Sequence, residues 1–224
     1  MLTLLTATGM RPEAWAICER LMMAQTYAEP VRWIIVDDGE QPQPITFRRD
    51  GWVIELICPS PVWQPGQNTQ ARNLLAGLAH VRSDEKLVVI EDDDHVDPGY
   101  LTEVAKWLDQ ADLVGEPMAR YFNVSSGVGK QLQNKTHCSL CSTAVKGAGI
   151  EALRQAVAKN KKFIDMELWR TFRGKKFISN TRHVVGIKGL PGRGGIGCGH
   201  RMTGAPTAGL LRQWIGSDAE IYGY

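Results

Sequence analysis

The sequence predicts a single α/β domain in which a mostly parallel, twisted, Rossmann-like sheet is flanked by helices. Three observations predict this class: near-continuous apolar strands, amphipathic helices that alternate with them over residues 1–115, and acidic residues where two strands end. Strands without polar alternation are typical of a parallel sheet covered on both faces. Because ligands bind beyond the carboxyl ends of such strands, we expect the functional site there.

The elements of the first half follow from apolar runs and helical spacing. The runs LTLLT and VRWIIV predict buried strands. The first helix has Pro12 near its start, and its apolar residues from Trp15 to Met22 recur at helical spacing. We expect strands at residues 2–6, 31–36, 52–57 and 86–90, and helices at 12–25, 68–81 and 99–108.

Periodicity is weaker in the second half of the chain. We expect strands within residues 112–124 and at 183–187, and helices at 149–159 and 165–172. The tail from Lys188 contains KGLPGRGGIGCGHRMTG and predicts a long loop, of the kind that often acts as a lid. With no internal repeat and no linker, we expect one domain over residues 1–224.

Composition is that of an ordinary globular protein, with 43% hydrophobic and 22% charged residues among 224. No apolar run approaches the roughly 18 residues of a membrane span, and the N-terminus lacks a signal-peptide pattern. We therefore expect a cytoplasmic protein with no membrane contact and no protein partner. Residues 1–149 have a charge balance of −6 and residues 150–224 one of +8, so the basic part is suited to phosphate groups.

The five cysteines are odd in number and scattered, which predicts reduced thiols. Cys138 and Cys141, with His137 beside them, offer half of a zinc site at most. Only Cys198 and His200 lie close enough together in sequence to complete it. The simpler interpretation is that Cys138 and Cys141 are small, half-buried strand residues.

Acidic residues follow two of the predicted strands. Asp37 and Asp38 end the run IIVDDG, and the segment EDDD at residues 91–94 follows the run VVI. Successive carboxylates repel one another unless a cation lies among them, and oxygen ligands suit Mg²⁺ and Mn²⁺. The alternative is a solvated acidic turn that precedes the next helix. Two acidic strand ends in one sheet favour the site for Mn²⁺ or Mg²⁺.

These segments resemble the GT-A glycosyltransferases, in particular their inverting, family-2-like branch. The resemblance covers most of residues 2–170 and depends on TAT with Arg11, VDDG at 36–39, ARN at 71–73 and EDDDHVDPGYL at 91–101. It implies a GT-A fold and a metal-dependent hexosyltransferase with a nucleotide-sugar donor, a UDP-sugar such as UDP-glucose. Residues 1–115 would bind the donor. Residues 116–224 would bind the acceptor and supply a C-terminal lid loop.

The resemblance also implies roles for particular residues of this chain. The spacing to Pro98 places Glu91 and Asp93 on the signature positions, while Asp92 and Asp94 form a literal D-x-D, so the metal-binding pair stays open. The implied donor contacts are Thr6 and Asp38 for uracil, Arg11 and Arg72 near the base, and Asp92 for ribose. Asp93 or Asp94 would bind the metal, together with His200 or, failing that, His183 or His95.

An inverting transfer needs a base for the acceptor hydroxyl. The segment FIDMELW at 163–169 resembles the acidic-pair segment of the family, and Ile164 replaces its first acid, which leaves Asp165 as catalytic base. Glu167 lies about 200° further around a helix and should face elsewhere. The alternative role for Asp165 is a plain helix N-cap. Arg193 and Arg201 of the glycine-rich loop would contact the diphosphate.

Residues 159–176 are rich in lysine and arginine and include Phe163, Trp169 and Phe172. Basic and exposed aromatic side chains suit a nucleic acid, whereas a solvated helix with its aromatics in the core is the alternative. The chain also resembles small bacteriophage glycosyltransferases, some of which modify viral DNA. This resemblance implies a DNA acceptor that carries 5-hydroxymethylcytosine or a similar base, flipped out of the duplex.

Three other functions are compatible with parts of the sequence. The same chemistry on a saccharide or other small acceptor is the nearest alternative. A sugar-1-phosphate nucleotidyltransferase would need a more glycine-rich N-terminal loop than ATGMR at residues 7–11. A non-catalytic nucleic-acid-binding module would leave the acidic strand ends unexplained, because they repel phosphates.

Overall fold

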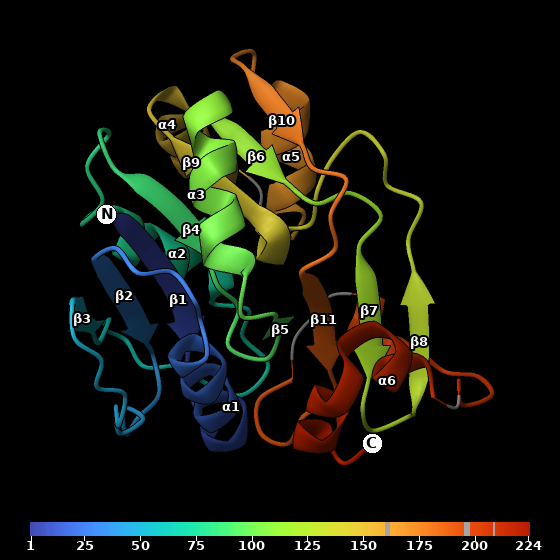
Figure 1. Ribbon diagram of the computed structural model, residues 1–224. Coiled ribbons are helices and arrows are strands. Elements are labelled where there is room, and N and C mark those ends of the chain that lie inside the picture. The colour runs from blue at the N-terminus through green and yellow to red at the C-terminus, as the bar shows by residue number, and fades with distance from the viewer. Residues whose placement is uncertain (160–161, 195–197, 208) are drawn as a thin grey trace.

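The main sheet is predominantly parallel, as the sequence predicts (Figure 1). The computed structural model describes residues 1–159, 162–194, 198–207 and 209–224. The seven strands of the main sheet have the order β10-β6-β9-β4-β1-β2-β3. On one side of the sheet, all neighbours are parallel: β1 (Leu2–Thr8), β2 (Val31–Asp37), β3 (Trp52–Ile57) and β4 (Lys86–Val89). The strand predictions of the first half are therefore confirmed, with ends shifted by one or two residues.

The other side of the sheet contains the one antiparallel strand of this sheet. β9 (Thr143–Lys146) lies between β4 and β6 (Leu113–Gly115) and is antiparallel to both. β10 (Lys176–Ile178) is the edge strand and pairs in parallel with β6. The sequence predicted neither β9 nor β10, because strands of three or four residues are too short to show a period.

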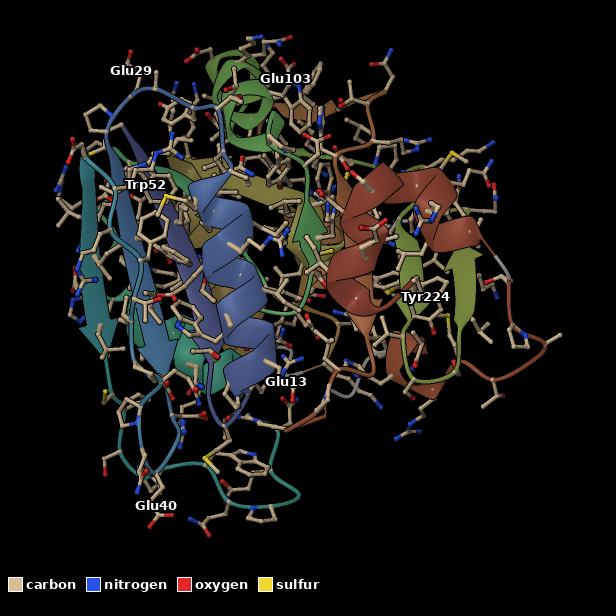
Figure 2. All side chains as sticks on the ribbon, turned by 60° about the horizontal axis from the view of Figure 1, so that its bottom comes forward. Glu13, Glu29, Glu40, Trp52, Glu103 and Tyr224 are labelled. Atoms are coloured by element: carbon tan, nitrogen blue, oxygen red, sulfur yellow. The ribbon has the colours of Figure 1, made fainter. Side chains whose placement is uncertain are left out.

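Helices cover both faces of the main sheet. Successive residues of β1 point to opposite faces of the sheet, so Leu4 packs in one apolar core and Leu5 in the other. The first core includes α1 (Pro12–Met23) and α3 (Tyr100–Gln110), and Figure 2 shows α1 running in front of the sheet beside β1. The second includes α2 (Gln70–Leu78), α4 (Ala148–Lys159) and α5 (Ile164–Thr171).

A second, four-stranded sheet lies beside the main one in Figure 1. Its order is β5 (His95–Val96), β11 (Val184–Lys188), β7 (Arg120–Asn123) and β8 (Val128–Gln131). The C-terminal segment packs on it through α6 (Leu210–Ile215) and the 3₁₀ segment η3 (Gly216–Tyr222). The expectation of a structureless tail is therefore wrong beyond residue 209, because Leu211, Ala219 and Tyr222 bury their side chains against Phe122 and Ile187.

The topology brings the predicted strand ends together. β1, β2 and β4 are parallel, so the residues after them meet at one edge of the main sheet. β11 of the second sheet ends at Lys188, whose side chain reaches the same place. None of the helices in the described ranges combines the length and the apolar character needed to cross a bilayer.

Candidate active site

A cavity of about 310 Å³ lies at this edge of the main sheet. Its volume is at the lower end of the range for small-molecule sites. Both sheets contribute to its lining, as do α5 and the glycine-rich C-terminal segment. The side chains that the chemistry depends on are Arg11, Glu91, Asp93, Asp165, Lys188 and His200.

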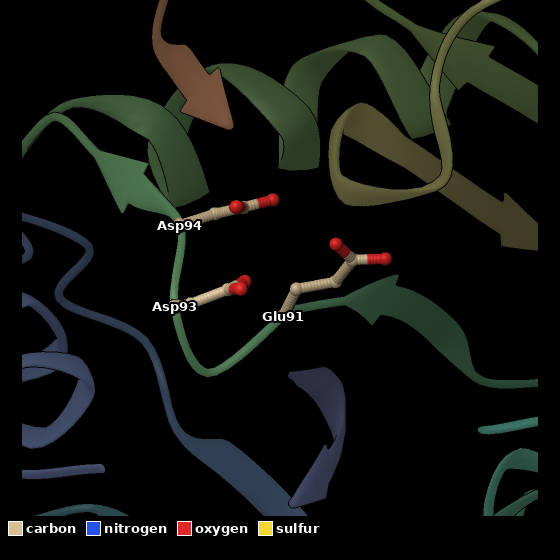
Figure 3. A group of neighbouring side chains, drawn as sticks. All are labelled: Glu91, Asp93 and Asp94. Carbon is tan, nitrogen blue, oxygen red and sulfur yellow. The ribbon is translucent and has the colours of Figure 1, made fainter. Parts of the chain in front are cut away.

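The β4 acidic cluster (Glu91, Asp92, Asp93 and Asp94) lies at the cavity, which its first three members line. Oxygens of Glu91, Asp93 and Asp94 all lie within 4.8 Å of one another, and Figure 3 shows these three carboxylates converging on a shared space. The three aspartates are buried and Glu91 is half-buried. Within the described residues this is the one group of three or more acidic, histidine or cysteine side chains with that proximity.

Arg11 neutralises part of this cluster from the loop after β1. Its guanidinium lies 2.5 Å from Asp92 and 2.6 Å from Asp93. Thr8 also donates a hydrogen bond of 2.7 Å to Asp92. Burial alone would lower the pKa of Arg11, but the two carboxylates raise it, so the guanidinium stays charged.

Lys188 is the second cation of the cluster. Its Nζ lies 2.6 Å from Asp94, 3.0 Å from Asp93 and 3.3 Å from Glu91. Although burial alone would raise the pKa of Asp93, the charges of Arg11 and Lys188 hold it well below its ordinary value. Asp93 is therefore the carboxylate of the cluster that is most firmly ionised.

The cluster nevertheless has more negative than positive charge. Four carboxylates face two cations, and Oδ2 of Asp94 is buried without a hydrogen-bond partner. Burial raises the pKa of Asp92 to about 6 and that of Asp94 well above its ordinary value. Such groups bind a proton or a further cation. The donor set is compatible with a divalent metal ion.

Asp38, after β2, lies in a separate and fully paired environment. Arg193 binds it at 2.6 Å and Arg72 at 2.9 Å, and Thr69 donates a further hydrogen bond. Burial alone would raise the pKa of Asp38, but Thr69, Asn73 and Arg193 bring it below its ordinary value. Arg193 also stacks on Trp63, with 4.8 Å between the guanidinium carbon and the ring centroid.

Gly9 permits this close packing around Asp38. Its φ of +147° is unfavourable for other residues, and a Cβ there would lie 2.4 Å from Oδ1 of Asp38. The glycine that follows the first strand is therefore required by the geometry of the site.

Asp165 also lines the cavity, from the first turn of α5. The helix begins after Phe163, so Asp165 is inside the helix and does not serve as its N-cap. Its carboxyl is half-buried, and burial raises its pKa although the backbone N–H of Met166 opposes the shift. Glu167 faces away, as the helical spacing predicts, and pairs with Lys159 at 2.7 Å.

The aromatic side chains of the lysine- and arginine-rich residues 159–176 lie partly in the core and partly at the cavity. Trp169 and Phe172 are buried in the core, which confirms the simpler interpretation for these two aromatics. Phe163 is 52% exposed and Met166 51% exposed, and both line the cavity mouth. Lys162 also lines the cavity, with its Nζ 5.8 Å from the Phe163 ring centroid.

Several predicted contacts lie outside the cavity lining. Thr6 is fully buried, and its hydroxyl accepts a hydrogen bond of 2.9 Å from the Trp33 indole. Arg72 binds Asp38 and the carbonyl of Pro61 instead. Arg201 is exposed and does not line the cavity. Thr8, two residues after Thr6 on the same strand, is the threonine that reaches the cavity.

The histidines differ in the same way. His200 lines the cavity, and burial and Lys188 lower its pKa, which favours the neutral imidazole. It does not join the group formed by Glu91, Asp93 and Asp94. The two other predicted ligands lie elsewhere, with His183 paired to Asp97 at 2.6 Å and His95 to Asp218 at 3.0 Å.

Of the candidate zinc ligands, the side chain of Cys198 lies outside the described part of the chain, and the others form no ligand group among the described residues. Cys138 and Cys141 are fully buried, and Cys141 belongs to the short 3₁₀ segment η1 (Leu140–Ser142), so the prediction of half-buried strand residues is wrong. Burial raises the pKa of both thiols, which keeps them protonated. Neither thiol belongs to the carboxylate group described above.

Sequence reasoning missed the most central cation of the site. Lys188 was predicted only as the start of a loop, yet it directly follows the apolar run VVGI. The strand-end rule that identified the aspartates applies equally to this position. Trp63 was also missed, because the loop that places it carries no periodic signal. Asn73 lies in α2, within the predicted helix and the segment ARN, but was given no role.

The fold and the site together define the architecture as GT-A-type, a mixed α/β domain with a central sheet flanked by helices. No protein-family model matches the sequence, and no curated protein matches it either. Similar folds occur in structures of the Staphylococcus aureus glycosyltransferase TarS. TarS 1–349 in complex with UDP-GlcNAc has a TM-score of 0.59 and 13% identity, over 88% of this chain and 60% of that one.

Two further TarS structures give the same result. TarS 1–349 in complex with UDP has a TM-score of 0.58 and 12% identity, over 84% of this chain and 60% of that one. A longer TarS structure has a TM-score of 0.56 and 11% identity, over 84% and 37%. This chain thus spans at most 60% of the length of these neighbours. At such identities the likeness demonstrates the fold.

Proposed function

We propose that this protein is an inverting glycosyltransferase that moves a hexose from a UDP-sugar to a hydroxyl acceptor. One observation carries the proposal: the same cavity is lined by Glu91, Asp92 and Asp93 of the β4 acidic cluster and by Asp165. The acidic cluster has the charges to hold a diphosphate through a cation. Asp165 has a carboxyl whose raised pKa suits a proton acceptor.

In the proposed reaction, the Asp165 carboxylate accepts the proton of the acceptor hydroxyl. The acceptor oxygen then forms a bond to the anomeric carbon from the side opposite the diphosphate. The bond between the anomeric carbon and the diphosphate oxygen breaks, and its electron pair leaves with UDP. Half-burial of Asp165 supports this role, because partial removal from water makes a carboxylate a stronger base.

The diphosphate end would lie against the β4 acidic cluster. A divalent cation, Mn²⁺ or Mg²⁺, bound by Asp93 and Asp94 with Glu91, would supply positive charge to the departing diphosphate. The buried, unpartnered Oδ2 of Asp94 supports such a ligand set. His200 is close enough to line the same cavity and is proposed as a further ligand.

The proposed donor and acceptor rest on different support. A similar fold binds UDP-GlcNAc in TarS, which supports a UDP-sugar donor. For the acceptor we propose a hydroxymethylated pyrimidine, such as 5-hydroxymethylcytosine in phage DNA. The exposed Phe163 ring beside Lys162 at the cavity mouth supports it, because a flipped base stacks on an aromatic ring and its phosphate pairs with a cation.

The test follows UDP release from UDP-glucose and UDP-GlcNAc in the presence of Mn²⁺, with DNA that does or does not contain 5-hydroxymethylcytosine. We expect release that requires both the metal and the modified DNA. Release with simple sugars and without DNA would replace the DNA acceptor by a saccharide. If a panel of nucleotide sugars gave no release above that of the Asp165→Asn variant, the glycosyltransferase proposal would be wrong.

A further inference from the structure

Lys188 occupies the centre of the group that the proposed metal ion needs. Its ammonium has three N–H donors, and three carboxylates surround it, those of Glu91, Asp93 and Asp94. These are the same three residues whose oxygens lie within 4.8 Å of one another. The fold therefore already places a positive charge where a divalent ion would bind.

The stem of Lys188 is held in place from two sides. The backbone of β11 pairs with β7 at this residue, which fixes Cα. On the side chain, a Cβ at residue 199 would lie 2.8 Å from Cγ of Lys188, so the glycine at that position leaves just enough room for the stem. The ring centroid of Tyr121 lies 6.0 Å from Nζ. The ammonium is thus directed into the cluster by its packing as well as by its charge.

A divalent ion and the ammonium cannot use these three carboxylates together. Metal–oxygen distances are about 2.1 Å for Mg²⁺, so an ion shared by the three groups would lie within roughly 3 Å of Nζ. At that separation the two cations repel each other, and the ammonium already occupies oxygens that the ion would need. One occupant must leave before the other binds all three oxygens.

We propose that Lys188 is a built-in competitor of the divalent cation, which withdraws from Glu91, Asp93 and Asp94 when the ion binds. The inference rests on the cation site of the proposed function but not on its sugar chemistry. Lys188 keeps the cluster folded when no ion is bound, and it lowers the affinity of the free protein for the ion. A withdrawn ammonium would stay in the cavity that Lys188 lines, where it faces the phosphates of the donor.

The test is a titration of the protein with Mn²⁺ alone, without donor, by electron paramagnetic resonance of the free ion. Lys188→Met keeps the stem and removes the charge, and we expect it to bind Mn²⁺ about tenfold or more tightly than wild type. Lys86→Met is the matched control, because Lys86 pairs with Asp109 away from the cavity. That variant should bind as wild type does.

A second variant keeps the inference testable if Lys188→Met misfolds because the neighbouring carboxylates lose their counter-charge. Gly199→Ala retains the lysine but pushes its stem through the 2.8 Å contact, and it should also tighten Mn²⁺ binding, by a smaller factor. Thermal melting gives a second readout. Mn²⁺ should raise the melting temperature of Lys188→Met more than that of wild type.

The outcomes separate this inference from the proposed function. Equal Mn²⁺ affinity in wild type, Lys188→Met and Gly199→Ala would overturn the competition and leave the cation site intact. Absence of binding in all three would overturn the cation site, and the competition with it. Neither result depends on UDP release, so the proposed sugar transfer is tested separately by the UDP-release assay.

Discussion

Two strands that flank β1 end in successive carboxylates at the same edge of the main sheet, but their surroundings differ. After β2, Asp37 accepts the backbone N–H groups of Gly39 and Gln43, at 2.8 and 2.6 Å. Asp38 binds two guanidinium groups, and its pKa lies below its ordinary value. Both carboxylates of this β2 acidic pair therefore have hydrogen-bond or ion-pair partners inside the fold.

The β4 acidic cluster keeps an excess of negative charge. Its four carboxylates share Arg11 and Lys188, and burial raises the pKa of two of them. A similar sequence pattern thus has a structural role after one strand and the proposed binding role after the other. The difference lies in the number of donors supplied by distant segments, so the predictions below compare the two sites directly.

The largest effect should come from neither strand end but from Asp165, the proposed base, which lines the same cavity. Asp165→Asn keeps the shape of the side chain and removes its basicity, so we expect turnover to fall about a thousandfold. Mn²⁺ binding and the melting temperature should be unchanged, because the β4 acidic cluster is not altered. Glu167→Gln is the control, since Glu167 pairs with Lys159 and Arg170 outside the cavity. An Asp165→Asn variant with more than a tenth of wild-type turnover would exclude Asp165 as base.

Within the β4 acidic cluster, Asp93→Asn should lower turnover about a hundredfold and weaken Mn²⁺ binding. Some stability should also be lost, because Asp93 pairs with Arg11 and Lys188, although Arg11 keeps Asp92 and Lys188 keeps Asp94 as partners. Steady-state kinetics and chemical denaturation of one preparation measure both quantities. A large loss of stability with little loss of turnover would reverse the roles assigned to the two strand ends.

The contrast between the two strand ends also explains how far the sequence could predict the molecule. Buried parallel strands leave long apolar runs, so β1, β2 and β4 and the acidic residues after them were predictable. Which oxygen meets which cation depends on residues 80 to 155 positions apart in sequence, such as Arg11 with Asp92 or Asp38 with Arg193. No local pattern specifies those pairs.

In the second sheet, β7 and β11 overlap predicted strand segments, whereas β5, β8 and the helix packed on the sheet were missed for a different reason. β5 and β8 have two and four residues, too few to show alternation, and α6 follows a glycine-rich segment with six helical residues. The prediction for Thr6 failed for a related reason. Strand periodicity indicates the face of the sheet on which a side chain lies, but not the side chain that it will contact there. On that face the Trp33 indole binds the Thr6 hydroxyl, and Thr8 lies next to the cavity instead.

After β2, Asp38→Asn should act mainly on stability. We expect the free energy of unfolding to fall by about 1 to 2 kcal/mol at pH 7. This value is kept low because Arg72 is about a third exposed, and water screens its ion pair with Asp38. The folded pKa of Asp38 is depressed, so its contribution is present above its unfolded pKa of about 3.9 and is lost as the pH falls through the folded value. The difference from wild type in urea unfolding should therefore shrink toward pH 3. Asp84→Asn, at an exposed pair with Arg82, should show no such difference.

The smallest effect should come from Arg193, which links the two sites because it binds Asp38 and also lines the cavity. Asp38 offsets most of the charge of Arg193, and the guanidinium is held on the Trp63 ring. Arg193 can therefore contribute little to the binding of a ligand. Arg193→Met should therefore raise the KM for the UDP-sugar about threefold and leave kcat unchanged, since uniform binding is lost. A lower KM would mean that Arg193 takes the place of the nucleobase on Trp63 and Asp38 until the donor displaces it. In that case the β2 acidic pair would be a binding site as well, and the division of roles between the two strand ends would have to be abandoned.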